Sequence, residues 1–171
     1  MLEYLTSWTD DMLGAAHLAA ALTALFAGAM VVVLKKGTRL HVATGYIYIL
    51  AMLAVNASAL SKYDLTGAPN LFHFFAVCSL ATLIAGYSAA LAFRRSRRIS
   101  AAAAHGALML WSYFGLVIAL IAEIFTRAVP FMLHGEGGFT RFAMALGLFM
   151  LAGGWLMNRF ISREIARTLR N

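Results

Sequence analysis

The sequence has few charged residues for its length. Asp, Glu, Lys and Arg make up only 12% of its 171 residues, whereas a soluble domain has about a quarter. Hydrophobic residues make up 62% of the chain, and one small core could not remove that much apolar surface from water. The composition therefore argues against a soluble domain and indicates a protein that resides in lipid.

Acidic residues are especially scarce, and the chain carries a net charge of +7 at pH 7. A basic chain could suggest nucleic-acid binding. The basic residues, however, lie in short segments between apolar runs, where they set membrane topology and contact anionic lipid headgroups. We therefore expect a lipid bilayer, and no nucleic acid, as their partner.

Cysteine is almost absent. Cys78 is the single cysteine, which excludes a disulfide framework within the chain and the C-x-x-C-H motif of covalently attached haem. The first residues lack the basic segment of a secretory signal, and Asp10 and Asp11 follow them. We therefore expect the first apolar run to be a retained helix rather than a cleaved signal peptide.

Long apolar runs are present instead. Five of them approach the length of about 20 residues that a helix needs to cross a bilayer, and they cover about residues 12–34, 42–61, 71–93, 101–126 and 140–160. Glycine, proline and charge separate the runs, as is typical of loops. The sequence therefore predicts an all-α polytopic membrane protein with five transmembrane helices, as an up-down four-helix bundle plus one peripheral helix.

The basic residues also predict an orientation. If the five runs cross the bilayer alternately, 11 Lys and Arg residues fall on one side and three on the other. Cytoplasmic loops carry an excess of Lys and Arg, which places the N-terminus outside the bacterial inner membrane and the C-terminus in the cytoplasm. The expected segments are an extracytoplasmic N-terminus, the bundle, an extracytoplasmic loop, and a fifth helix with a basic tail, at residues 1–11, 12–126, 127–138 and 139–171.

Four of the five histidines pair by depth. At a rise of about 1.5 Å per residue, His17 and His73 lie near the outer ends of the first and third predicted helices. His41 and His105 lie near the inner ends of the second and fourth. Helices one and three are diagonal in an up-down bundle, as are helices two and four. Each pair can therefore supply the two axial ligands of a b-type haem.

Each histidine also has a simpler interpretation. Near a helix end, a neutral histidine often lies at the interface or hydrogen-bonds to a neighbouring helix. Small neighbours favour the haem hypothesis: Gly45 lies four residues after His41, and Gly14 and Ala21 flank His17. Haem is also favoured over zinc because each pair brings only two ligands, whereas zinc usually takes three or four.

The segment from Lys36 to Tyr48 resembles the signature K-G-T-x-x-H-x-x-x-G-x-x-Y of an uncharacterised bacterial family of multi-pass membrane proteins, a domain-of-unknown-function family. Further features of that family recur at His17, Phe72, His73, His105 and Met109. The resemblance covers about residues 14–125 and leaves the fifth run outside it. It implies a histidine-bearing membrane bundle and implies no activity.

The leading hypothesis is a transmembrane b-type cytochrome-like electron-transfer protein that binds one or two haem b groups. His17 and His73 would ligate an outer haem, and His41 and His105 an inner one. The alternation of histidines between odd and even helices is similar to the architecture of two-haem transmembrane b-type cytochromes. The protein would move electrons across the bilayer, with a quinone, a ferric species or a redox protein as its partner. It would then be a membrane oxidoreductase.

Two other functions stay open. A zinc-dependent membrane hydrolase would need three ligands in one leaflet, with a carboxylate assisting. The candidates for it are His17, His73 and His134, with Asp64 or Glu123. A haem or small-molecule carrier, or an accessory subunit, would need no redox turnover. The fifth helix has no histidine and is a candidate surface for a partner or a homodimer.

Polar and small residues predict contacts between helices. Small residues form a seam on the first helix and another on the fifth, and both favour close approach to a neighbouring helix. The seams consist of Gly14, Ala21, Ala24 and Gly28 on the first helix and of Ala143, Gly147, Gly153 and Gly154 on the fifth. Asn56, Ser58 and Ser61 in the second helix can hydrogen-bond to other helices. Ser58 as a nucleophile would need a base, and no residue is identified for that role from the sequence.

Overall fold

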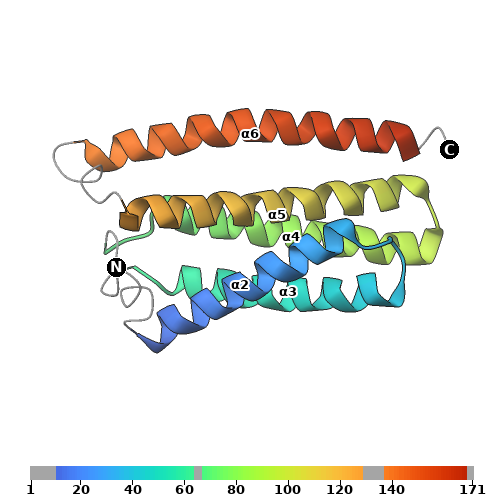
Figure 1. The fold of residues 1–171 in the computed structure, drawn as a ribbon, viewed down its shortest axis with the longest axis horizontal. Helices are drawn as coiled ribbons and strands as arrows, with labels where there is room; N and C mark the ends of the chain where they lie inside the picture. The colour runs from blue at the N-terminus through green and yellow to red at the C-terminus, as the bar shows by residue number, and fades with distance from the viewer. Residues whose placement is uncertain (1–10, 64–66, 129–136, 169–171) are drawn as a thin grey trace. The chain divides into compact units, whose positions relative to one another are not determined.

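The computed structural model describes residues 11–63, 67–128 and 137–168, and this part of the chain contains five helices and no strand (Figure 1). The helices are α2 (Met12–Val33), α3 (Arg39–Leu60), α4 (Leu71–Ser96), α5 (Ile99–Ala128) and α6 (Gly138–Thr168). All five are long and apolar enough to cross a membrane. The prediction of an all-α membrane protein with five spans is therefore confirmed.

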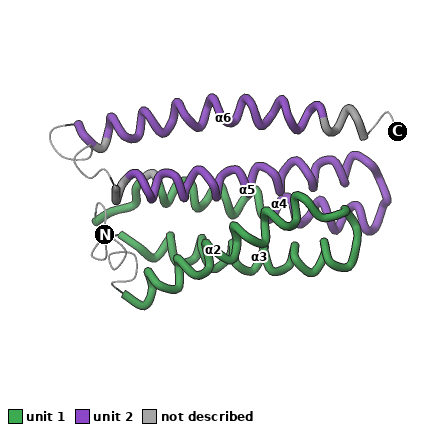
Figure 2. Tube along the Cα trace, viewed as in Figure 1, with its two compact units in different colours: residues 1–83 green, residues 84–171 purple. Residues whose placement is uncertain are grey.

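The chain forms two compact units, Met1–Leu83 and Ile84–Asn171 (Figure 2). The first unit contains α2, α3 and the first half of α4, and the second contains the rest of α4 with α5 and α6. The predicted four-helix bundle involves both units and stays a prediction.

The connection between α2 and α3 accounts for the K-G-T part of the sequence signature. Lys36 closes α2, because its Nζ donates to the carbonyl oxygens of Val31, Val32 and Leu34 at 2.9, 2.6 and 3.3 Å. Gly37 follows at φ +78°, a left-handed conformation that favours glycine. Thr38 caps α3, since its hydroxyl accepts from the backbone N–H of His41 at 3.2 Å. Partial burial lowers the pKa of Lys36.

Small residues bring α2 close to α3 in the first unit. Gly14, Ala24, Ala27 and Gly28 are the buried residues of α2, and the two helices pack against each other along their length. Close approach through Gly and Ala is typical of helices in lipid, where packing rather than the hydrophobic effect holds helices together. Three residues of the seam predicted on the first helix, Gly14, Ala24 and Gly28, are thus buried.

Polar side chains connect α3 to α4 in the same unit. Asn56, only 3% exposed, donates from Nδ2 to the carbonyl of Met52 at 2.7 Å and to Oγ of Ser79 on α4 at 3.2 Å. The predicted ability of Asn56 to hydrogen-bond across helices is confirmed. The amide satisfies one backbone carbonyl of its own helix and one hydroxyl of the next.

In the second unit, two glycines of α6 pack against large aromatic side chains of α5. A Cβ on Gly153 would lie 2.8 Å from Cζ of Phe114, and one on Gly154 would lie 3.0 Å from Cη2 of Trp111. The two rings meet edge to face, with centroids 5.6 Å apart. The glycine pair of α6 therefore fits over two aromatic rings of α5, as the close approach predicted for the fifth helix requires.

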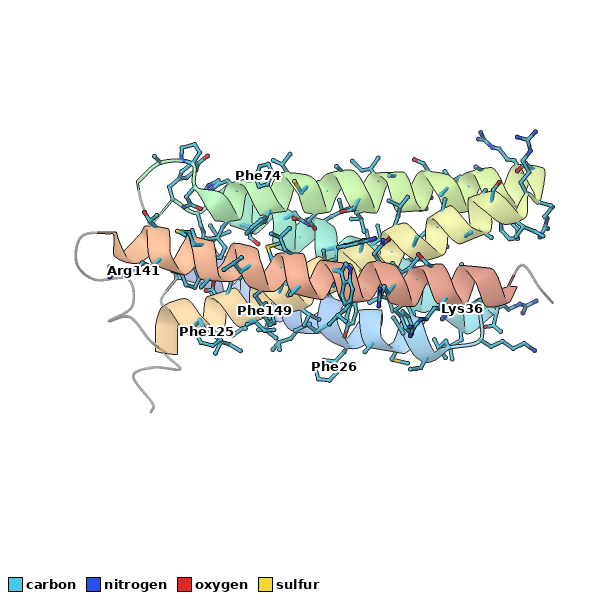
Figure 3. All side chains as sticks on the ribbon, turned by 90° about the horizontal axis from the view of Figure 1, so that it is seen from above. Phe26, Lys36, Phe74, Phe125, Arg141 and Phe149 are labelled. Atoms are coloured by element: carbon cyan, nitrogen blue, oxygen red, sulfur yellow. The ribbon has the colours of Figure 1, made fainter. Side chains whose placement is uncertain are left out.

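Large apolar side chains point away from their helices into the surroundings. Phe26, Phe74, Phe125 and Phe149 are 72, 61, 50 and 49% exposed and carry labels in Figure 3. Such exposure over several helices would be costly in water and is ordinary in hydrocarbon. The distribution of side chains thus agrees with a lipid environment.

Candidate cofactor-binding histidines

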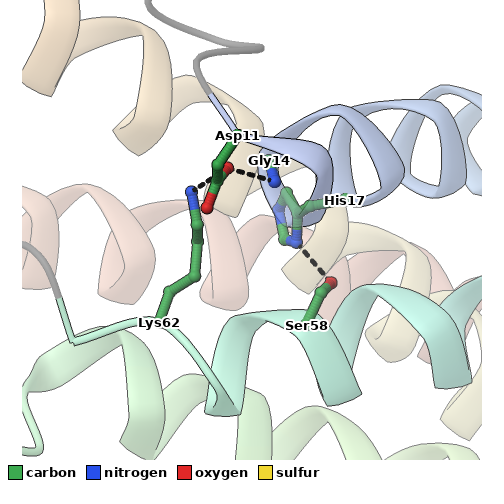
Figure 4. Close-up of polar contacts among 5 residues, drawn as sticks. All are labelled: Asp11, Gly14, His17, Ser58 and Lys62. Atoms are coloured by element: carbon green, nitrogen blue, oxygen red, sulfur yellow. Dashed lines mark hydrogen bonds and ion pairs between the residues drawn. The ribbon is translucent and has the colours of Figure 1, made fainter.

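His17 lies on α2 and contacts α3. Its Nδ1 is 2.8 Å from Oγ of Ser58, which is 7% exposed (Figure 4). The Ser58 hydroxyl also donates within α3, to the carbonyl oxygens of Ala54 and Val55 at 2.7 and 3.0 Å. The structure therefore assigns His17 a hydrogen-bond partner on the second helix that was not identified from the sequence.

An ion pair lies at the same end of α2 and α3. Asp11 caps α2 by accepting from the backbone N–H of Gly14 at 2.6 Å, and the same Oδ1 lies 3.3 Å from Nζ of Lys62 (Figure 4). The Gly14 hydrogen bond, followed by the ion pair with Lys62, lowers the pKa of Asp11. Polar contacts thus join the two helices next to His17.

His73 is buried in the first turn of α4. Its Nδ1 accepts from the backbone N–H of Asn70 at 3.3 Å and lies 3.2 Å from Oδ1 of the same residue. The ring centroids of His73 and Tyr63 are 4.6 Å apart. The imidazole is only 7% exposed. Its Nε2 is buried and has no hydrogen-bond partner in the described part of the chain. An unsatisfied buried nitrogen costs about 1–3 kcal/mol, so this atom is a candidate ligand.

His41 lies in the first turn of α3, directly after the cap formed by Thr38. Its side chain is half-buried. A Cβ on Gly45, one turn further along, would have no neighbouring side chain within 4 Å among the described residues. The surface of α3 is therefore open at Gly45, and the room for a macrocycle beside His41 stays a prediction.

His105 connects α5 to α4 in the second unit. Its Nδ1 lies 2.9 Å from the carbonyl oxygen of Gly86. A carbonyl only accepts, so Nδ1 carries the hydrogen, and the lone pair of the neutral ring is on Nε2. Gly86 also lets α5 approach α4 closely, because a Cβ there would lie 2.9 Å from Sδ of Met109.

The hydrogen bonds described for three histidines thus go to three different neighbours. His17 and His73 share the first unit, whereas His41 and His105 fall in different units. The predicted pairing at two depths is not tested by these contacts and stays a hypothesis.

The ligand set of the zinc hypothesis is incomplete in the structure. His134 and Asp64 lie outside the described residues, while Glu123 lies on α5 in the second unit. Residues 11–63, 67–128 and 137–168 contain no group of three or more His, Cys, Asp or Glu side chains that could hold a metal ion.

The prediction that Ser58 hydrogen-bonds to another helix is confirmed, but its partner, His17, was not predicted from the sequence. A comparison of depth would have found it, because Ser58 lies two residues before the end of α3 and His17 lies five after the start of α2. Antiparallel neighbours joined by a short turn bring such positions together. The base that Ser58 would need as a nucleophile is thus nearby, but its hydroxyl hydrogen is directed at backbone carbonyls.

Comparison with known proteins adds a family and no activity. No curated protein and no solved structure matches the chain. A family described as a predicted membrane protein (DUF2306) matches residues 14–164. The match includes most of α6, so the expectation that the fifth helix lies outside the family resemblance is wrong. The chain belongs to this family of predicted membrane proteins.

Proposed function

We propose that the protein is a transmembrane b-type cytochrome-like electron-transfer protein in which histidines hold haem. The observation that carries this proposal is the Nε2 of His73, which is buried without a hydrogen-bond partner in the described part of the chain. An axial ligand needs this arrangement: one ring nitrogen held by the protein and the other directed at a guest.

The ring nitrogens of two further histidines support the proposal. His105 donates from Nδ1 to a backbone carbonyl, so its lone pair lies on Nε2. Nδ1 of His17 contacts a hydroxyl. Metal-ligating histidines usually donate their other N–H to a carbonyl, a carboxylate or water, which fixes the tautomer and the ring orientation. Three of the four candidate histidines thus have Nδ1 engaged by a neighbouring polar group.

In this proposal the chain holds the haem, orients its histidine ligands and keeps water away from it. Asn70 and Tyr63 would orient His73, Gly86 would orient His105, and the apolar helices would exclude water. A bound haem would supply a one-electron iron couple. The proposal places His17 and His73 at an outer site and His41 and His105 at an inner one.

The proposal includes an orientation. The excess of Lys and Arg in the loops before α3 and α5 and in the tail puts those segments in the cytoplasm and the N-terminus outside a bacterial inner membrane. Electrons would then cross between the two faces, with a quinone, a ferric species or a redox protein as partner.

The test is the haem content of full-length protein purified from haem-replete cells without added haem. We expect a Soret band and a reduced-minus-oxidised spectrum typical of a low-spin b-type haem. His73→Ala should remove the outer haem, whereas the matched control His134→Ala, which changes the histidine outside both pairs, should retain the wild-type content. Absence of a Soret band in the wild type, or equal haem in His73→Ala, contradicts the proposal. Zinc without iron on elemental analysis would favour the hydrolase.

A further inference from the structure

We infer that Ser58 is a positioning residue that fixes the tautomer of His17 and thereby sets the reduction potential of the outer haem. The second half of this inference rests on the proposed function. The first half concerns the chain alone and can be tested without haem. Ser58 lies on α3 and His17 on α2, so the contact joins two helices (Figure 4).

Counting hydrogens determines the direction of the bond. A serine hydroxyl has one hydrogen and two lone pairs. Ser58 directs that hydrogen at the carbonyl oxygens of its own helix, 2.7 Å from Ala54 and 3.0 Å from Val55. With its hydrogen donated there, the Ser58 oxygen accepts from Nδ1 of His17, 2.8 Å away. Neutral His17 then carries its hydrogen on Nδ1 and its lone pair on Nε2, the arrangement of an iron ligand.

Burial of Ser58 strengthens the influence of its hydrogen bond on the His17 ring. The residue is 7% exposed, so water does not compete freely for its oxygen. An N–H donated to a polarised hydroxyl raises the basicity of the opposite ring nitrogen. A more basic ligand stabilises ferric over ferrous iron, so Ser58 should lower the potential of the haem that His17 ligates.

Ser61 provides a matched control on the same helix. Its hydroxyl donates to the carbonyl of Ala57 at 2.9 Å, the same i−4 bond that Ser58 makes to Ala54, and it is exposed. Ser61→Ala therefore removes a hydroxyl and a helix back-bond without changing the contact to His17. Any effect confined to Ser58→Ala then belongs to the imidazole.

The first measurement is the tautomer of His17 in haem-free protein. Nitrogen NMR of histidine-labelled full-length chain, with His17 assigned from a His17→Gln sample, should show hydrogen on Nδ1 in the wild type and in Ser61→Ala. In Ser58→Ala we expect a shift toward the Nε2–H form. Hydrogen on Nε2 in the wild type, or an unchanged tautomer in Ser58→Ala, overturns the inference and leaves the haem proposal intact.

The second measurement is a potentiometric titration of the haem-loaded protein. We expect Ser58→Ala to weaken ferric relative to ferrous binding about tenfold, within the 10- to 100-fold range of outer-shell effects. That ratio corresponds to a potential about 59 mV higher for a one-electron couple. Ser61→Ala should titrate as the wild type does. Identical curves for the wild type and Ser58→Ala overturn the inference about potential.

If Ser58→Ala loses its haem, a conservative variant distinguishes loss of the hydroxyl from loss of packing. Ser58→Thr keeps the hydroxyl and should retain both haem and potential. Loss of haem in both variants means that packing, not the hydroxyl, is responsible, and this overturns the inference. A wild type with Nδ1–H on His17 but no haem overturns the proposed function and the claim about potential, while the tautomer assignment stands.

Discussion

The α2–α3 contact of the first unit and the α5–α6 contact of the second involve different kinds of side chains. Polar bridges from Asp11 to Lys62 and from His17 to Ser58 join α2 to α3. Aromatic rings set against Gly153 and Gly154 join α5 to α6. In lipid, apolar burial favours neither helix pair over a lipid contact, so association depends on hydrogen bonds or on close packing. Hydrogen bonds contribute to the α2–α3 contact of the first unit, and close packing of rings on glycines contributes to the α5–α6 contact of the second.

The two contacts differ in whether they include a candidate ligand of the cofactor. The polar bridges of the first unit include His17, a candidate ligand, whereas the residues that lie against Gly153 and Gly154 in the second unit are Phe114 and Trp111. A hydrogen-bonded contact can orient an imidazole, while a ring against a glycine can only set how closely two helices approach. We therefore expect substitutions at the glycines to affect stability strongly and haem content little.

The largest expected effect is at Gly153. Gly153→Ala would place a methyl group 2.8 Å from Cζ of Phe114, so α6 must shift or the ring must move. Overpacking of this kind costs about 1–3 kcal/mol. We expect a lower midpoint of thermal unfolding for the detergent-solubilised protein, measured by circular dichroism.

Gly147 on the same helix is the matched control. A Cβ there meets no neighbouring side chain within 4 Å among the described residues. Gly147→Ala should therefore be neutral or stabilising, since alanine is the better helix former by about 0.5–1 kcal/mol. Equal destabilisation by both substitutions would show that glycine matters for the helix itself and not for its contact with α5.

A medium effect is expected at the hydrogen bond between α3 and α4. Asn56 donates to Oγ of Ser79 at 3.2 Å. Interhelical hydrogen bonds in membranes average about 0.6 kcal/mol in double-mutant cycles, with a maximum of about 1.7. The cycle of Asn56→Ala, Ser79→Ala and the double variant should give a coupling free energy in that range. Strict additivity would mean that Asn56 serves only its own helix, through the carbonyl of Met52.

The number and approximate positions of the helices could be predicted from the sequence, because each apolar run is close in length to the thickness of a bilayer, although α6 continues to Thr168, past the predicted end at about residue 160. The end of α4 was placed at residue 93, but the helix continues to Ser96. Arg94 and Arg95 extend it, since long basic side chains can reach the interface while their backbone stays helical. Composition alone cannot locate such an end.

The contacts of the histidines could not be predicted in the same way. The helices α2 and α3 are apolar on most of their surface, so no amphipathic stripe indicates which side of each faces a neighbour. The bond of His17 to Ser58 links residues 41 positions apart, and the bond of His105 to Gly86 uses a backbone carbonyl that no side-chain pattern reveals. Depth along the helix is encoded in the sequence, whereas rotation about its axis depends on packing.

The smallest expected effect concerns Asp11, whose pKa is lowered from 3.8 first by the Gly14 N–H and then by Lys62. Because the folded pKa lies below the unfolded one, the carboxylate contributes stability above about pH 4 and loses it as the pH falls through the folded pKa. Asp11→Asn keeps a capping oxygen but does not titrate. The difference in unfolding midpoint between wild type and Asp11→Asn should thus be constant from pH 7 to pH 5 and shrink below pH 4, and added salt should reduce the part that comes from Lys62. A difference that stays constant down to pH 3 would show that the ionic part of the α2–α3 bridge contributes nothing, and that His17 and Ser58 carry the polar contact of the first unit.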